Sequence, residues 1–254
     1  MRRGRLALFV AVLAAATLVA TAAAAADNQG RQVRPALFIG IDTSGSFQRI
    51  AYDDALTFVA HYIYGHLRGL GGLARPRDLF VAGIGGNEAD QAKAFHPVHD
   101  FADKDVGQLE ADLKRWFPPR DTLTDFNAFF RQIARITKER GLMLIPITVV
   151  IVSDGVPDIP GIQANSPLAY GKVDLGPLEY LARTVTVRLV YTSPPVGEKW
   201  RRLVARKRVR LWTVDHEVMK GWRAQMQPDV APARQGRLWK WVRENVDYRV
   251  RRGI

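Results

Sequence analysis

Short runs of apolar, often β-branched residues alternate along this chain with longer segments in which apolar residues recur at helical spacing. The short runs predict strands over residues 36–42, 78–85, 93–99, 145–153, 185–191 and 209–214, of which 93–99 is a short edge strand. The longer segments predict helices over residues 47–68, 106–117, 125–139, 197–207 and 217–226. Strands that are apolar on both faces and alternate with helices indicate an α/β fold, with a doubly wound, mostly parallel sheet and helices on both faces.

The two ends of the chain follow other patterns. Residues 1–26 hold three arginines near the start and then an uncharged run that ends in small residues, as a secretory signal peptide does. Because the run over residues 6–26 is also long enough to span a bilayer, an uncleaved membrane anchor is the alternative. Either case predicts an exported protein, periplasmic or extracellular, whose main domain covers residues 35–226.

At the other end, residues 227–235 hold two prolines and predict a linker to a basic, amphipathic C-terminal helix within residues 236–254. Leu238, Val242 and Val246 lie near one stripe of this helix, flanked by arginine and lysine. Such a helix either covers the core of the domain or lies on an anionic membrane surface. Packing on the domain is favoured, because amphipathic helices of globular proteins mostly cover cores.

The net charge of +12 is unevenly distributed along the 254 residues. Residues 1–26 carry 3 basic and no acidic side chains, residues 27–198 carry 18 and 20, and residues 199–254 carry 16 and 5. The central domain is therefore close to neutral, and the excess of basic residues belongs to the last fifth of the chain. Nucleic acid is not an expected partner of an exported chain, and the complete lack of cysteine means that the core holds without disulfides.

Oxygen-bearing side chains follow two of the predicted strands and open one helix. In an open α/β sheet ligands bind beyond the carboxyl ends of the strands, so these side chains are candidates for one site. They are Asp42, Ser44 and Ser46 after the first strand, Asp154 after the most apolar strand, and Thr122 or Thr124 before the helix over 125–139. Gly45 is expected to let the backbone fold tightly between the two serines. A set of hydroxyls and carboxylates without Cys or His suits Mg²⁺ or Mn²⁺ rather than zinc or copper.

These residues resemble a known family, the von Willebrand factor type A (vWA) domain with its metal-ion-dependent adhesion site. The resemblance covers roughly residues 35–226 and rests on three pieces in the family's order: Asp-x-Ser-x-Ser at Asp42, Ser44 and Ser46, a threonine that opens a later helix, and Asp154-Gly155. It implies that the two serines and the threonine touch the metal, while the aspartates act mostly through bound waters. The family's glycine pair before the threonine is absent here. Thr124 is the favoured ligand because Thr-Asp-aromatic-x-Ala continues into the helix as in the family, and Thr122 is the alternative.

The resemblance implies a site that captures an acidic side chain of a protein partner at a vacant position of the cation. The expected function is therefore a non-catalytic adhesion or interaction module. The first alternative is a structural scaffold subunit of a cell-envelope complex, and the second is a metal-dependent hydrolase that uses Asp42 or Asp154. Residues 156–176, which leave the sheet beside the site, are expected to shape ligand specificity. His96 and His99 are expected to serve the surface or packing rather than zinc.

Overall fold

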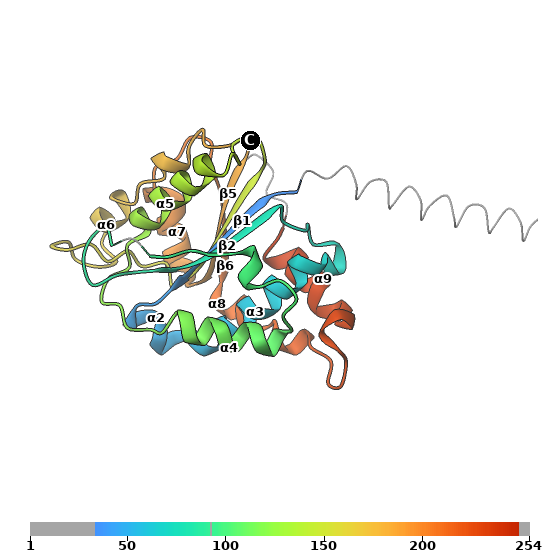
Figure 1. The fold of residues 1–254 in the computed structure, drawn as a ribbon. Helices are drawn as coiled ribbons and strands as arrows, with labels where there is room; N and C mark the ends of the chain where they lie inside the picture. Colours follow the sequence, from blue (N-terminus) through green and yellow to red (C-terminus); the bar gives the residue numbers. More distant parts are fainter. Residues whose placement is uncertain (1–33, 92, 249–254) are drawn as a thin grey trace, which may run out of the picture. The chain divides into compact units, whose positions relative to one another are not determined.

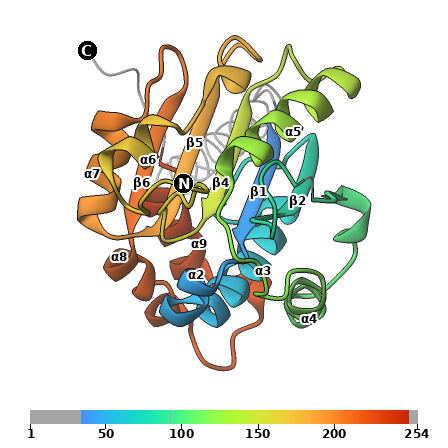
Figure 2. The same cartoon turned by 90° about the vertical axis from the view of Figure 1, so that its left-hand side faces the viewer.

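A single sheet of six strands organises the part of the chain that the structure describes, residues 34–91 and 93–248 of this computed structural model. The strands are β1 Ala36–Asp42, β2 Asp78–Ile84, β3 His96–Pro97, β4 Ile147–Val152, β5 Val185–Thr192 and β6 Arg210–Asp215. Their order is β3-β2-β1-β4-β5-β6, and Figure 2 shows β6 to β2 from left to right. All neighbouring pairs are parallel except β2 and β3. The predicted α/β fold is confirmed. The predicted signal peptide or anchor over residues 1–26 lies outside the described residues.

Helices cover both faces of this sheet (Figure 1). They are α2 Gly45–Ile50, α3 Tyr52–Arg68, α4 Val106–Trp116, α5 Phe126–Glu139, α6 Pro167–Gly171, α7 Pro194–Leu203, α8 His216–Lys220 and α9 Gly236–Asn245. One core lies between the sheet and α3, α4, α8 and α9, and a second lies between the sheet and α5, α6 and α7. In the described part of the chain, no helix is long and apolar enough to cross a membrane.

The alternation of side chains along β1 divides these two cores. Leu37, Ile39 and Ile41 point into the core under α3, and Phe38 points into the core under α5. Successive side chains of a strand face opposite sides, so a strand covered on both faces must be apolar at nearly every position. All seven residues of β1 are buried, which explains why the sequence marks this strand so clearly.

Several helix boundaries differ from the sequence prediction. The helix predicted over residues 47–68 is interrupted at Ala51, whose extended φ of −157° separates α2 from α3. The segment 217–226 forms the five-residue helix α8 and a short 3₁₀ turn. The last helix ends at Asn245, and Arg188 binds the chain directly after it: its Nη1 donates to the carbonyl oxygens of Val246 (2.7 Å) and Tyr248 (3.0 Å).

The C-terminal helix α9 belongs to the first core. Leu238, Trp239, Val242 and Val246 are fully buried, and α9 contacts the short turn Leu70–Gly72 that follows α3. The segment 227–235, which the sequence predicts as a linker, is closed by the buried Gln235. Its amide accepts from the Gln227 N–H and donates to the carbonyls of Gln227 and Val230. The apolar stripe Leu238, Val242 and Val246 therefore packs on the domain, as the favoured interpretation of the sequence expected.

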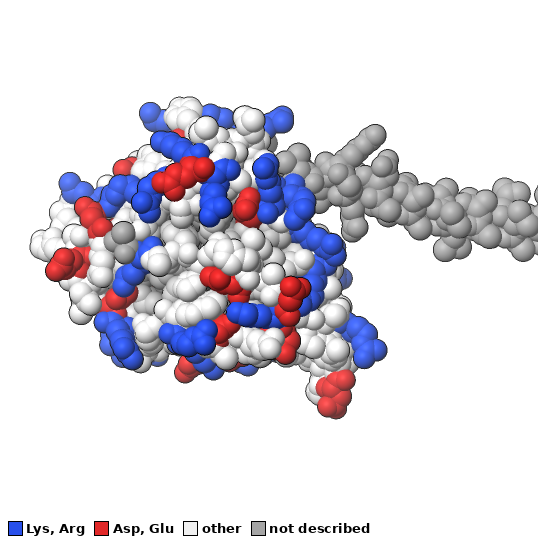
Figure 3. Space-filling model, in the orientation of Figure 1, with Lys and Arg blue, Asp and Glu red and all other residues white. Residues whose placement is uncertain are grey.

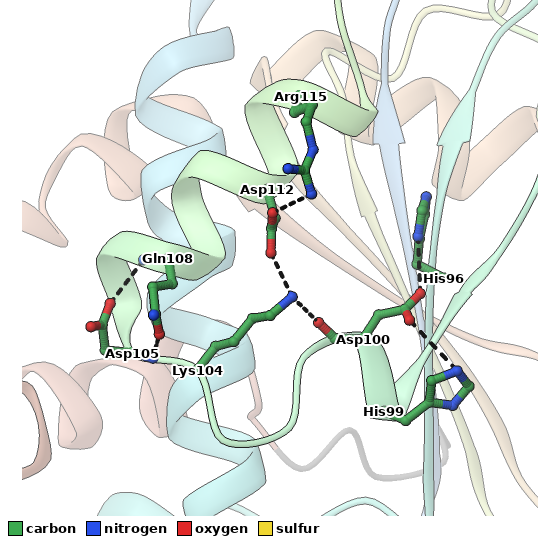
Figure 4. Close-up of polar contacts among 8 residues, drawn as sticks. All are labelled: His96, His99, Asp100, Lys104, Asp105, Gln108, Asp112 and Arg115. Atoms are coloured by element: carbon green, nitrogen blue, oxygen red, sulfur yellow. Dashed lines mark hydrogen bonds and ion pairs between the residues drawn. The ribbon is translucent and has the colours of Figure 1, made fainter.

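Polar contacts fix the segment between β3 and α4 (Figure 4). His96 and His99 both face Asp100, at 3.1 Å and 3.5 Å, and the His96 ring stacks on Trp116 with 4.0 Å between ring centroids. Lys104 reaches the Asp100 carbonyl and the Asp112 carboxylate, each at 2.6 Å. His96 therefore joins the edge strand to α4, while His99 is exposed beside Asp100.

Candidate functional site

Asp42 is the last residue of β1 and is completely buried at the carboxyl edge of the sheet. Its Oδ1 accepts from the Ser44 N–H at 2.9 Å, and its Oδ2 accepts from the Ser153 hydroxyl at 2.6 Å. Ser153 directly follows the neighbouring strand β4, and its Oγ also accepts from the Gly155 N–H. Ser153 therefore joins the two strand ends. The sequence shows it beside Asp154 but gives no sign of this role.

The carboxyl of Asp154 lies close enough to Asp42 for the two to influence each other electrostatically. The pKa of Asp42 is raised to about 7: burial is the largest cause, hydrogen bonds from Ser153 and Ser44 oppose it, and the neighbouring Asp154 adds to it. Burial also raises the pKa of Asp154, against hydrogen bonds from Val156 and Ser46. Two buried carboxyls side by side are stable in ionised form only when a cation compensates them.

Three hydroxyl-bearing residues stand in front of these carboxyls. Ser44, Ser46 and Thr124 line one hollow of about 400 Å³, and the Oγ atoms of Ser44 and Ser46 lie 3.1 Å apart. Adjacent ligands of an octahedral cation with metal–oxygen distances of ~2.1 Å are separated by roughly 3.0 Å. The spacing of the two serines therefore fits two neighbouring positions of such a cation.

The loop that carries the two threonines is held against the ends of β1 and β2. The Asp121 carboxylate accepts from the Thr43 hydroxyl and from Lys93 Nζ, the latter at 2.9 Å. The Asp121 N–H donates to the Thr43 carbonyl at 3.1 Å. Gly85, with φ +141°, is required beneath the loop, since a side chain there would meet Asp121 and Leu123. Thr43, Lys93 and Asp121 were not singled out from the sequence, because only the folded chain brings them together.

The two candidate threonines have different surroundings. Thr124 is buried, at 2% exposure, directly before Asp125, the residue that caps α5. Thr122 is exposed, and its hydroxyl lies within 3.5 Å of the Gly86 carbonyl and 3.4 Å of Asn87 Oδ1. Both residues line the hollow, but Thr124 alone of the two is buried, which favours it as a ligand.

Two glycines near the site have different importance. Gly155 has φ +79°, and a side chain there would meet Thr192, Leu189 and Val196, so the turn that follows Asp154 requires glycine. Gly45 does not have a positive φ, and a Cβ at this position would approach only the Arg49 guanidinium, at 4.0 Å. The expectation that Gly45 permits a tight turn is therefore wrong: it is simply the first residue of α2.

Two charged residues at the hollow were not identified from the sequence. Arg49 on α2 and Asp158 on the loop after β4 both line it, and the Asp158 N–H donates to the Thr124 carbonyl at 3.4 Å. Arg49 lies four residues after Gly45, and residues at this spacing are neighbours on a helix surface. The sequence could therefore have indicated that Arg49 lies near the site. Val156 and Ala164 also line the hollow, so part of segment 156–176 forms its wall. The rest of that segment includes α6, capped by Ser166.

The donor set fits a hard divalent cation. Hydroxyl and carboxylate oxygens from three loops meet at one edge of the sheet, and such oxygens are the ligands of Mg²⁺ and Mn²⁺. Among the residues that the structure describes, no group of three or more His, Cys, Asp or Glu side chains could hold a metal. The hydroxyls would therefore have to supply ligands that carboxylates supply in most cation sites.

No family model and no curated protein sequence matches this chain. Solved structures with a similar fold include proximal thread matrix protein 1 of the mussel byssus, at 12% identity and a TM-score of 0.46 over 74% of this chain and 46% of that one. The pilus adhesin SpaC of Lactobacillus rhamnosus GG has 12% identity and a TM-score of 0.46 over 76% and 29%. Manganese-loaded TRAP protein of Plasmodium vivax has 14% identity and a TM-score of 0.39 over 72% and 69%.

This chain thus spans less than half the length of the first two proteins, and identities this low concern the fold alone. The fold itself agrees with the resemblance seen in the sequence. A mostly parallel six-stranded sheet lies between two layers of helices, and the Asp-x-Ser-x-Ser segment leaves its β1 strand at the carboxyl edge. In its architecture the described chain is therefore an α/β domain with a mostly parallel sheet covered by helices on both faces.

Proposed function

We propose that this protein is an exported, non-catalytic interaction module that binds a divalent cation, Mg²⁺ or Mn²⁺, and through it an acidic side chain of a protein partner. Ser44, Ser46 and Thr124 would supply hydroxyl ligands, with Asp42 and Asp154 behind them. Neutral hydroxyls leave much of the cation's charge uncompensated, so the cation attracts a carboxylate from outside.

The observation that carries this proposal is the arrangement of the hollow. Its wall holds the hydroxyl-bearing residues, with two serine oxygens 3.1 Å apart, while the carboxyl of Asp42 is fully buried behind them. The hollow is open to solvent on its outer side, where Arg49 is exposed. A cation held in this way would present a free position outward, and the positive charge of Arg49 would favour an incoming carboxylate over a cationic group.

Calorimetric titration with Mg²⁺ and Mn²⁺ tests the cation site. Wild type is expected to bind both ions, and Ser44→Ala with Ser46→Ala to weaken binding by at least tenfold, since even residues that only support metal ligands contribute about that much. Ser193→Ala is a matched control, because Ser193 also follows a strand of this sheet but its side chain makes no capping bond. The same affinity in the double variant as in wild type would contradict the site.

Carboxylate capture is tested separately with acetate, added to the Mn²⁺-loaded protein while water proton relaxation is followed. Acetate is expected to displace metal-bound water and lower the relaxation enhancement, and chloride at equal ionic strength is the control. Cation binding without any acetate effect would contradict the interaction module and favour a scaffold in which the cation only stiffens the loops. Turnover of phosphoesters that Asp42→Ala abolishes would contradict the non-catalytic role.

A further inference from the structure

The edge of the sheet opposite the candidate site has an unusual surface. It is formed by three segments that lead into β4, β5 and β6, residues 138–145, 179–184 and 204–209, which we call the basic pole. These segments are neighbours, because the strands that follow them are paired and parallel, and the Ile147 N–H donates to the Thr184 carbonyl at 2.8 Å. The candidate site lies at the carboxyl ends of the same strands, so the two surfaces face in opposite directions.

Large apolar side chains protrude from the basic pole. Leu144 is 89% exposed, Tyr180 67% and Met143 48%, which places three of the eight large exposed hydrophobic residues of the described chain on this surface. Leu144 contributes almost nothing to the core in this position. Single exposed apolar residues are common, but several on neighbouring loops at one end of a domain are typical of an interaction surface.

Basic side chains surround these apolar residues. The three segments contain six lysines and arginines against two glutamates. Glu179 is occupied within the pole, since its carboxylate accepts from the backbone N–H groups of Lys207 (2.6 Å) and Arg208 (2.7 Å). Figure 3 shows Lys and Arg side chains along the upper edge of the molecule, above the ends of the strands. The basic pole exposes Lys138, Arg140, Arg183, Lys207 and Arg208.

The chain also enters the domain at this edge. β1 begins at Ala36, whose N–H donates to the Pro146 carbonyl beside the pole, at 2.9 Å. Only residues 27–33 separate the described chain from the uncharged run over residues 6–26. Seven residues can extend over at most about 25 Å. The length of this segment therefore limits the distance between Arg34 and the end of the apolar run to about that value in an uncut chain.

From these observations we infer that the basic pole is a membrane-binding surface that recognises an anionic bilayer. Exposed leucine, methionine and tyrosine enter the interface of a bilayer, while flanking lysines and arginines are attracted to the phosphate groups of anionic lipids. Charge alone would also suit nucleic acid, but an exposed leucine flanked by a second apolar side chain adds nothing to the binding of phosphates in water. The apolar run within reach of the pole likewise favours a bilayer.

The lack of cysteine in this chain allows a direct test. Leu144→Cys in the full-length chain is labelled with an environment-sensitive fluorophore and mixed with vesicles of phosphatidylcholine alone or with one-third phosphatidylglycerol. The fluorescence is expected to increase several-fold on the anionic vesicles only, and to fall with added salt. Leu168→Cys is the matched control, because Leu168 is 59% exposed on α6 in the segment after β4 and is not expected to respond.

Charge reversal tests the basic residues themselves. Arg140→Glu with Arg183→Glu is expected to weaken binding of the labelled protein to anionic vesicles by roughly tenfold for each arginine reversed. Arg120→Glu with Arg237→Glu removes the same charge from exposed positions away from the pole and should leave binding nearly unchanged.

Three results would overturn the inference. One is an equal response at positions 144 and 168, and another is a response that does not require anionic lipid. The third is an equal response at position 144 when vesicles are replaced by double-stranded DNA or by a higher concentration of the protein itself. The last case would assign the pole to nucleic acid or to a second copy of the chain.

Discussion

Thr122 and Thr124 differ in how firmly the fold holds their hydroxyls. Thr124 is buried between the loop after β4 and the start of α5, whereas Thr122 is exposed beside Gly86 and Asn87. A cation ligand must stay in place without the cation, because ordering it on binding would reduce affinity. The sequence favoured Thr124 with Thr122 as the alternative, and the burial of Thr124 supports the same choice.

This difference predicts effects of different size on Mn²⁺ affinity for two alanine variants. Thr124→Ala should lower Mn²⁺ affinity by at least tenfold, while Thr122→Ala should change it by less than about threefold, since only the first removes a held ligand. Mn²⁺ titration by calorimetry measures both. Circular dichroism before each titration controls for folding, and a larger loss in Thr122→Ala would reverse the assignment.

The residues of the candidate site were predictable from the sequence to different degrees. Asp42, Ser44 and Ser46 lie within five residues, so their spacing alone suggested a common role. The structure brings the two serines to one hollow with Thr124 and buries Asp42 beside Ser44. Arg49, Asp121 and Ser153 were missed as parts of the site, because their importance depends on distances across the sheet. Their roles, and the identity of the ligands, stay predictions until a cation is measured.

At the scale of the elements, α9 is a part of the domain rather than an appendage. Trp239 is 1% exposed, and its indole N–H donates to the Pro232 carbonyl at 3.0 Å. Gly65 and Gly71 provide space for its ring and backbone: a Cβ at either would come within 2.6 Å of Trp239. The helix and the surface that receives it are therefore matched in shape.

Trp239→Ala is accordingly expected to lower the free energy of unfolding by about 3–5 kcal/mol, as truncations of buried aromatic residues do. Urea denaturation followed by circular dichroism measures the change. Lys240→Ala, at the neighbouring exposed position of the same helix, is the control and should stay within about 0.5 kcal/mol of wild type. An equally small effect of both variants would mean that α9 does not support the core.

The strands were easier to predict than the ends of the helices. Strands buried on both faces must be continuously apolar, so β1, β4 and β5 were visible in the sequence to within about two residues. Helix ends depend on distant partners. Directly after the end of α9 at Asn245, the chain contacts Arg188 in the middle of β5, and no local pattern around position 245 indicates that contact.

At the scale of the whole molecule, one buried ionic cluster joins α3, β5 and the chain after α9. The Asp247 carboxylate accepts from the Tyr62 hydroxyl at 2.6 Å, lies 2.9 Å from His66 Nε2 and 3.7 Å from Arg188 Nε. Burial raises the pKa of Asp247, but His66, Arg188 and Tyr62 outweigh it and lower the pKa to about 2. Burial lowers the pKa of His66, but Asp247 outweighs it and the net pKa is raised.

The cluster predicts a defined pH dependence of stability. A lowered Asp247 pKa stabilises the fold above its unfolded value of about 4, and this contribution is lost as pH falls toward 2. A raised His66 pKa stabilises the fold below about 6.5, and this contribution is lost as pH rises through the folded value. The cluster should therefore contribute most between about pH 4 and pH 6.5.

Melting temperatures from pH 2 to pH 9 measure this dependence. Asp247→Asn should lower stability by about 3–5 kcal/mol near pH 5, because it leaves buried cationic groups without their partner. The stability of this variant should also decrease less than that of wild type when the pH is moved below or above about 5. Asp229→Asn, in the exposed loop before α9, is the control. A wild-type profile that Asp247→Asn leaves unchanged would mean that the cluster does not set the pH range.

The parallel arrangement of the strands also fixes how far the domain can reach. Strands β1, β4, β5 and β6 have six to eight residues each. At ~3.3 Å per residue, the two ends of each strand are separated by roughly 20–26 Å. With the basic pole on a bilayer, the cation site would stand at that height above the lipid and face away from it. The domain would then select partners by distance as well as by charge: proteins that extend well clear of the membrane could be captured, whereas those lying flat on its surface could not.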